Sequence, residues 1–264
     1  MKVQNSVVSG AFYPADAEEL KSMILGFLRE FDNLEKQVPK AIIAPHAGYI
    51  YSGLAAAAAF SSLKNANDKI KRVIVMAPSH RYPFSGIAIS SADFFRTPLG
   101  EIKVDRNSLD KINNLPQIIE IDAAFNIEHA LEVELPFLQI QLENFSLIPL
   151  LVGSASSSEI AEVLEILWEE EGTLIVVSSD LSHYHDYKTA QRIDQNTINK
   201  ILALDYQHIF GEEACGYMGV SGLLKFAKSK FWKPKLMLLN NSGDTEGDKQ
   251  HVVGYGAVVF EEVE

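Results

Sequence analysis

Residues 73–80, Val-Ile-Val-Met-Ala-Pro-Ser-His, join a short apolar run to a proline and two polar residues. Two further segments follow the same pattern: residues 41–46 are Ala-Ile-Ile-Ala-Pro-His, and residues 174–180 are Leu-Ile-Val-Val-Ser-Ser-Asp. Short apolar runs of this kind are typical of strands buried on both faces of a parallel sheet. Because the carboxyl ends of parallel strands lie at one edge of a sheet, we expect the polar residues that follow them to converge there.

Strand-like and helix-like segments alternate along most of the chain, which is typical of α/β proteins. We expect antiparallel strands in residues 86–104, where they interrupt this alternation. One helix should begin near Cys215. Pro136 should kink the helix that is predicted near residues 128–142. The other helices are predicted near residues 16–31, 54–63, 159–168 and 187–204. Since no linker rich in Pro, Gly or Ser divides the chain, residues 1–264 are predicted to form one domain, with a largely parallel or mixed central sheet flanked by helices.

Composition narrows the class of partner and the compartment. The 264 residues are 47% hydrophobic and 22% charged, as in ordinary globular proteins. The formal net charge of −12 disfavours binding to nucleic acid and to anionic membrane surfaces. The single cysteine excludes an intramolecular disulfide and favours a reducing compartment. No apolar run approaches the ~18 residues of a membrane span, and the first residues do not resemble a signal peptide, so we expect a cytoplasmic protein.

Histidines and one aspartate follow the three predicted strands. His46 and His80 each come directly after a strand, and Asp180 comes after the third. His183 is three residues beyond Asp180, so in a helical turn the carboxylate would orient its ring and raise its basicity. A lone histidine at a strand end often has only a structural role, but several ionisable groups brought together favour a functional site.

Two other residues have both a structural and a functional interpretation. His129 is predicted to open a helix, where it would serve as a packing or capping residue or line a pocket. Cys215 lies among small residues at the entry to a helix; free cysteines are commonly buried, but a helix start also lowers the pKa of a thiol. Because the chain has one cysteine and seven histidines, any metal site must use mostly imidazole and oxygen ligands, with at most one thiolate.

Six segments taken in order resemble the Memo family, and the match extends from residues 10–14 to residues 254–257. Members of that family are similar in fold to the class III extradiol ring-cleaving dioxygenases, with a pocket at one edge of an α/β sheet. The segments are Ala-Pro-His-Ala-Gly-Tyr at residues 44–49, Pro-Ser-His at 78–80, Arg-Thr-Pro-Leu-Gly at 96–100, Glu-His-Ala-Leu-Glu at 128–132, Ser-Ser-Asp-Leu-Ser-His at 178–183, and Cys-Gly at 215–216.

The resemblance assigns roles to residues of this chain. It implies metal ligands at His46, His80 and Cys215, with Asp180 and His183 completing the pocket. The matching motifs place three further residues at the pocket wall: His129, Tyr49 and Ser79. The dioxygenases hold ferrous iron with two histidines and a carboxylate, whereas here a softer, oxidisable thiolate takes the third place. The implied metal is therefore iron or copper before zinc, and ring cleavage does not follow from the fold.

Three functions are compatible with these residues. The first is a redox or oxygen-dependent reaction on a small substrate, with His183 as general acid and base oriented by Asp180. The second is a non-catalytic module that holds a peptide or metabolite in the same pocket. The third, hydrolysis through Ser79 or Ser179 with His183, ranks last because the sequence lacks a nucleophile elbow. The resemblance also implies association with an AMMECR1-like protein and a radical SAM protein.

Overall fold

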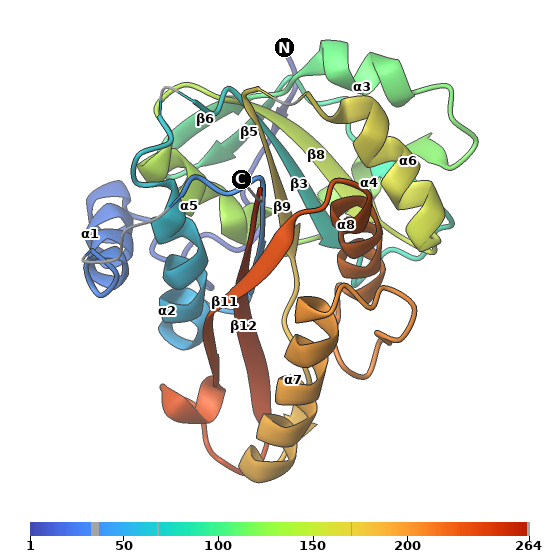
Figure 1. Ribbon diagram of the computed structural model, residues 1–264. Helices are drawn as coiled ribbons and strands as arrows, with labels where there is room; N and C mark the ends of the chain where they lie inside the picture. Colours follow the sequence, from blue (N-terminus) through green and yellow to red (C-terminus); the bar gives the residue numbers. More distant parts are fainter. Residues whose placement is uncertain (33–36, 68, 170, 263–264) are drawn as a thin grey trace.

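The computed structural model describes residues 1–32, 37–67, 69–169 and 171–262. Within this part of the chain a nine-stranded sheet forms the centre of the molecule (Figure 1). Its strands are β2 (Ala41–Ala44), β3 (Arg72–Pro78), β4 (Ile87–Ile89), β7 (Ile118–Glu120), β8 (Ser146–Val152), β9 (Thr173–Ser178), β10 (His183–His185), β11 (Lys233–Asn241) and β12 (Val252–Glu261). They are arranged in the order β10-β12-β2-β9-β3-β8-β4-β7, with β11 on the other edge of β12.

The middle of this sheet is parallel, as the three apolar runs predict. β9 lies between β2 and β3 and is parallel to both, and β3 is parallel to β8. The register pairs Ala44 with Ser178 and Pro78 with Val152, so these strands end at one edge. β12 and β4 are antiparallel to their neighbours β2 and β8, which makes the sheet mixed.

A small second sheet contains the predicted antiparallel excursion. It consists of β1 (Val3–Gln4), β5 (Phe94–Thr97) and β6 (Gly100–Lys103). β5 and β6 are antiparallel, whereas β1 is parallel to β5. The prediction of antiparallel strands in residues 86–104 is therefore confirmed for this hairpin, while β4 belongs to the main sheet.

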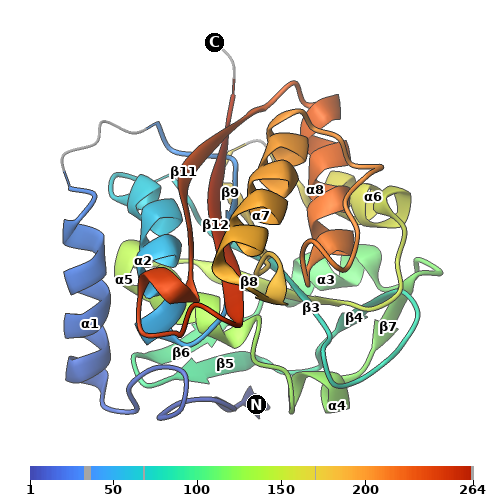
Figure 2. The same ribbon diagram turned by 90° about the horizontal axis from the view of Figure 1, so that it is seen from below.

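Helices cover both faces of the main sheet. They are α1 (Ala17–Arg29), α2 (Tyr49–Phe60), α3 (Arg106–Ile112), α4 (Asp122–Phe125), α5 (Leu135–Gln141), α6 (Ser157–Leu167), α7 (Tyr187–Leu202) and α8 (Tyr217–Ser229), with short 3-10 helices at Ser61–Leu63, Glu132–Glu134 and Ser242–Asp244. Figure 2 shows α1, α2 and α5 on one side and α3, α6, α7 and α8 on the other. Asp16 caps α1 by accepting the amides of Glu18 and Glu19. The predicted α/β class, a mixed sheet flanked by helices, is confirmed.

The expected helix over residues 128–142 is wrong in its first half. A turn precedes the 3-10 helix, and α5 begins only at Leu135. The carboxylate of Glu128 accepts the amides of His129 and Ala130, which caps the turn locally. Pro136 lies in the first turn of α5, where a missing N–H costs no helical bond, so the expected kink is absent.

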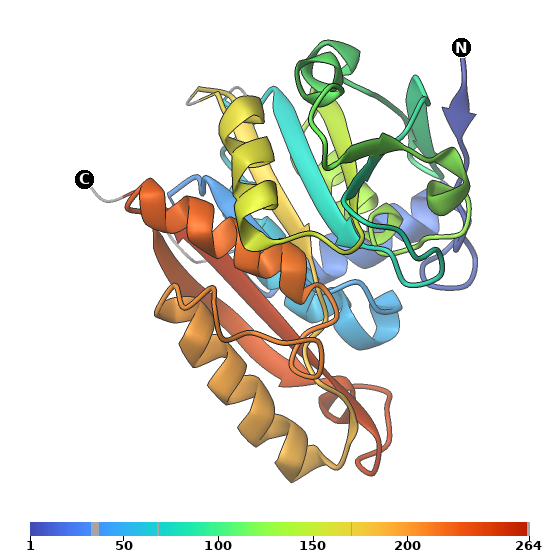
Figure 3. The same cartoon turned by 90° about the vertical axis from the view of Figure 1, so that its right-hand side faces the viewer.

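Apolar side chains from the sheet and from helices on both of its faces form one continuous core. The alanine-rich α2 contributes residues with no exposed surface, such as Ala57 and Ala58. In the side view of Figure 3 the first residues of the chain and the end of β12 lie at opposite sides of the molecule. None of the helices in the described ranges is long and apolar enough to span a membrane.

Candidate metal centre

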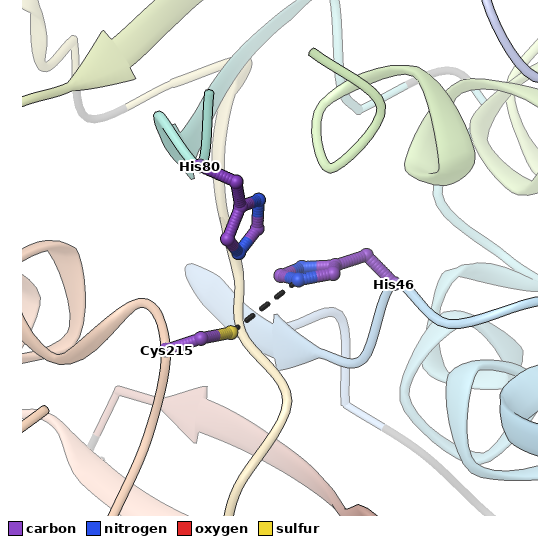
Figure 4. A group of neighbouring side chains, drawn as sticks. All are labelled: His46, His80 and Cys215. Atoms are coloured by element: carbon purple, nitrogen blue, oxygen red, sulfur yellow. Dashed lines mark hydrogen bonds between the residues drawn. The ribbon is translucent and has the colours of Figure 1, made fainter. Parts of the chain in front are cut away.

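His46, His80 and Cys215 meet at the edge where the parallel strands end. His46 follows β2 by two residues, His80 follows β3 by two residues, and Cys215 comes just before Gly216, the N-cap of α8. Each offers a ligand atom within 4.8 Å of the other two. Figure 4 shows both rings directed toward the sulfur, and Nε2 of His46 lies 3.3 Å from Sγ of Cys215.

This donor set fits a metal ion. A tetrahedral ion with bonds of about 2.05 Å to nitrogen and 2.3 Å to sulfur would hold those two atoms roughly 3.5 Å apart. The observed 3.3 Å between Nε2 and Sγ is close to that separation. Two imidazoles and one thiolate suit copper(I), iron and zinc, because these metals accept nitrogen and soft sulfur ligands.

Hydrogen bonds hold both the backbone and the ring of His46, and burial keeps the ring neutral. Only 2% of the residue is exposed, and its backbone amide donates to Oδ1 of Asp180 over 2.8 Å. Its Nδ1 lies 2.7 Å from the hydroxyl of Ser178, which leaves Nε2 for the cluster. Burial lowers the pKa of His46 to about 4, against an opposing effect of the Asp180 charge. A neutral imidazole is the form that binds a metal.

Cys215 is a protonated thiol without a metal. Burial raises the pKa of Cys215, and the negative charge of Asp180 raises it further. The amide of Asp180 donates to Sγ over 3.3 Å but does not offset these effects. The expectation that the helix start lowers this pKa is therefore wrong, because desolvation outweighs the helix. Metal binding would have to displace the thiol proton.

Glu128 holds two histidines by their Nδ1 atoms, a role that the sequence did not suggest. Its Oε1 lies 3.0 Å from Nδ1 of His80 and 3.2 Å from Nδ1 of His129. The two rings stack with centroids 5.2 Å apart. Burial opposes the ionisation of Glu128, but the hydrogen bonds from His129 and His80 outweigh it and hold its pKa well below its usual range. The carboxylate therefore leaves Nε2 of His80 free for the cluster.

His80, Glu128 and His129 form a second group with metal-ligand spacing. However, the carboxylate of Glu128 also accepts the amides of His80, His129 and Ala130. Because these amides already occupy the carboxylate oxygens, we interpret this group as one that orients His80 and not as a second metal site. His129 lies beside the cluster, and its ring meets that of His46 edge to face at 5.5 Å.

Asp180 and His183 do not form the pair that the sequence suggested. His183 begins β10 and pairs with Val253 instead of entering a helical turn. Its Nδ1 lies 2.8 Å from the carbonyl oxygen of Leu181, so a backbone group orients the ring. Asp180 instead contacts two of the three proposed ligands: its carboxylate accepts the amide of His46, and its own amide donates to the sulfur of Cys215.

A cavity of about 510 Å³ opens at this edge between the ends of β3, β8 and β9 and the start of α8. Ser79 and Cys215 line it, together with apolar side chains such as Phe84 and Met218. None of its described lining residues carries a charge. Tyr49 is placed elsewhere: it is 1% exposed in α2, and its hydroxyl donates to the carbonyl of Val133.

The serines of the hydrolase hypothesis have other partners. The Ser79 hydroxyl donates to the carbonyl of Tyr82 over 2.7 Å. The Ser179 hydroxyl donates to the carbonyl of Asp180 over 2.8 Å. Each is thus engaged with backbone, and the Nδ1 of His183 is likewise engaged with Leu181. This geometry gives hydrolysis no support.

The fold and the cluster define an α/β protein with a candidate site of two histidines and one cysteine at a sheet edge. The model of the Memo family, described as Memo-like protein, matches residues 4–259. A "MEMO1 family protein" of Aquifex aeolicus is 32% identical over 98% of this chain and 100% of the relative. Another, of Archaeoglobus fulgidus, is 34% identical over 96% of this chain and 97% of the relative. The chain belongs to the Memo family.

Proposed function

We propose that this chain binds a metal ion at His46, His80 and Cys215 and carries out a redox or oxygen-dependent reaction on a small molecule. The observation that carries the proposal is the meeting of two imidazole nitrogens and one sulfur within 4.8 Å of one another. Iron or copper ranks before zinc as the native metal, because the proposed reaction is a redox one. A metal bound here supplies one-electron chemistry or polarises an oxygen atom of the substrate.

The chain's own residues would orient the ligands and move protons. Asp180 fixes the backbone of His46 and contacts the sulfur of Cys215. His183 donates its Nδ1 proton to the carbonyl of Leu181, so Nε2 is left to accept or release a proton as a general acid and base. The uncharged lining of the cavity favours an uncharged substrate, since a buried charge would lack a partner there.

Metal analysis tests the site directly. Protein purified without chelator is compared with the variants His46→Ala and Cys215→Ser and with His251→Ala, which removes an exposed histidine outside the cluster. We expect near-stoichiometric metal in the wild type and in His251→Ala, and a loss of most of it in the other two. Unchanged metal content in both cluster variants would reject the site.

A non-catalytic binding module is the alternative, and the cavity is large enough to hold its ligand. About 510 Å³ lies within the usual range for small-molecule pockets, whether or not turnover occurs. Catechol-type substrates are assayed under oxygen with iron, copper and zinc in turn. Saturable binding without oxygen consumption would favour the module over the enzyme. Association with an AMMECR1-like protein and a radical SAM protein, and a cytoplasmic location, stay predictions.

A further inference from the structure

Three polar groups surround the hydroxyl oxygen of Ser178, behind the His46 ring and away from Cys215. Nδ1 of His46 lies 2.7 Å from it, the carbonyl oxygen of Ala130 lies 2.7 Å from it, and Oε1 of Glu134 lies 2.6 Å from it. Ser178, Ala130 and Glu134 have no exposed surface. The three distances are those of strong hydrogen bonds, and each therefore needs a proton.

Counting protons gives one consistent assignment. A serine hydroxyl carries one proton and two acceptor lone pairs, and a backbone carbonyl can only accept. The Ser178 proton must therefore go to Ala130, since nothing else could supply a proton to that contact. The remaining two contacts need protons from His46 Nδ1 and from the carboxyl group of Glu134. If Glu134 were a carboxylate that accepted the Ser178 proton, the hydroxyl oxygen of Ser178 and the carbonyl oxygen of Ala130 would lie 2.7 Å apart with no proton between them.

The surroundings of Glu134 support the neutral form independently. Within the described part of the chain, no lysine or arginine forms an ion pair with it, and its Oε2 has no hydrogen-bond partner. A buried carboxylate with one bare oxygen is much costlier than a neutral acid. Burial raises the pKa of Glu134 well above its usual range, and the hydrogen bond to Ser178 offsets only part of that effect.

We infer that Glu134 is a buried neutral acid that positions His46: through Ser178 it keeps a proton on Nδ1 and directs the Nε2 lone pair toward Cys215. The inference rests on the proposed function only where that lone pair is offered to a metal, because the proton assignment holds without one. The two histidines are then supported differently. A neutral hydroxyl and acid lie behind His46, whereas the Glu128 carboxylate lies behind His80.

Two spectra of the chelator-treated protein test the proton assignment at neutral pH. In infrared difference spectra we expect Glu134→Gln to remove the carbonyl band of a protonated carboxylic acid. The control Glu143→Gln, at an exposed glutamate, should leave that band in place. In nitrogen-15 spectra of histidine-labelled protein, the signals lost in His46→Gln should report a protonated Nδ1 and a bare Nε2. An unchanged acid band in Glu134→Gln, or a proton on Nε2 of His46, would overturn the inference.

Metal affinity tests the positioning role. Ser178→Ala should weaken metal binding about 10- to 100-fold, as loss of a support behind a ligand usually does. Glu134→Gln should bind within about threefold of the wild type, because its amide N–H can replace the acid proton, whereas Glu134→Leu should weaken binding like Ser178→Ala. Equal affinities of Glu134→Leu and wild type would overturn the role. Should Ser178→Ala misfold, the two spectra still decide. A wild type that binds no metal would reject the proposed function but leave the spectral result standing.

Discussion

Acid should destabilise the metal-free protein through His46. This residue is 2% exposed, and burial lowers its pKa to about 4 in the folded state, whereas an unfolded chain has a histidine pKa of about 6.5. Between these values the unfolded chain binds a proton that the folded chain does not. The contribution of the neutral His46 to the free energy of unfolding is therefore complete above pH 6.5 and is lost as the pH falls toward 4. A difference of roughly 2.5 pKa units corresponds to about 3 kcal/mol.

Urea unfolding with a chelator at pH 7.5 and pH 4.5 measures this loss. The comparison protein is His46→Gln, which does not titrate but keeps a side chain able to bond with Ser178. All other titrating groups are shared, so their contributions cancel in the difference between the two proteins. We expect the wild type to lose roughly 2 to 3 kcal/mol more than the variant over this range. Equal losses would show that burial of His46 does not suppress its charge, and would refute the reasoning.

Three further outcomes follow from contacts at the site. Glu128→Gln should weaken metal binding about 10- to 100-fold in calorimetric titrations, and unchanged affinity would contradict its support of His80. Gly216→Ala should cost about 1 to 3 kcal/mol in urea unfolding, because the new Cβ would lie 2.6 Å from a backbone oxygen. The control Gly26→Ala, whose Cβ meets nothing within 4 Å, should not destabilise α1. Cys215 in the folded, metal-free protein should react with iodoacetamide at pH 7 at least about tenfold more slowly than in urea, and equal rates would contradict the raised pKa of its thiol.

The convergence of strand ends was predictable because it depends on local patterns and one rule of topology. Short runs such as residues 41–44 and 173–178 are too apolar for an edge strand, and parallel pairing then places their ends together. His46 and His80 follow from that placement alone. Cys215 does not, since it reaches the same edge from the start of α8. Its position at a helix entry allowed a functional interpretation, but only the family resemblance made it a metal ligand.

Elements that depend on distant partners could not be predicted in this way. β10 exists because His183 and His185 pair with Val253 and Val252, almost 70 residues later, and nothing within residues 180–185 indicates that pairing. The three-residue spacing suggested a helical turn that would join Asp180 to His183, but the pairing with β12 places His183 in a strand. The expected helix over residues 128–142 failed for a related reason. A leucine stripe predicts a helix, but Glu128 contacts the ring of His80, 48 positions earlier, and residues 132–134 form a 3-10 helix before α5 begins at Leu135.

Glu134 illustrates why the supporting layer of a site is harder to predict than its ligands. In Leu-Glu-Val-Glu-Leu, residues 131–135, an alternating glutamate reads as an exposed residue, because charged side chains are seldom buried without a partner. Its partner here is a hydroxyl at the end of β9, 44 positions along the chain, and that hydroxyl also contacts a proposed ligand. Neither residue is unusual alone. Each short contact around Ser178 needs a proton, and this requirement identifies the glutamate as a neutral acid. The requirement becomes visible only when all three partners are placed around one oxygen atom.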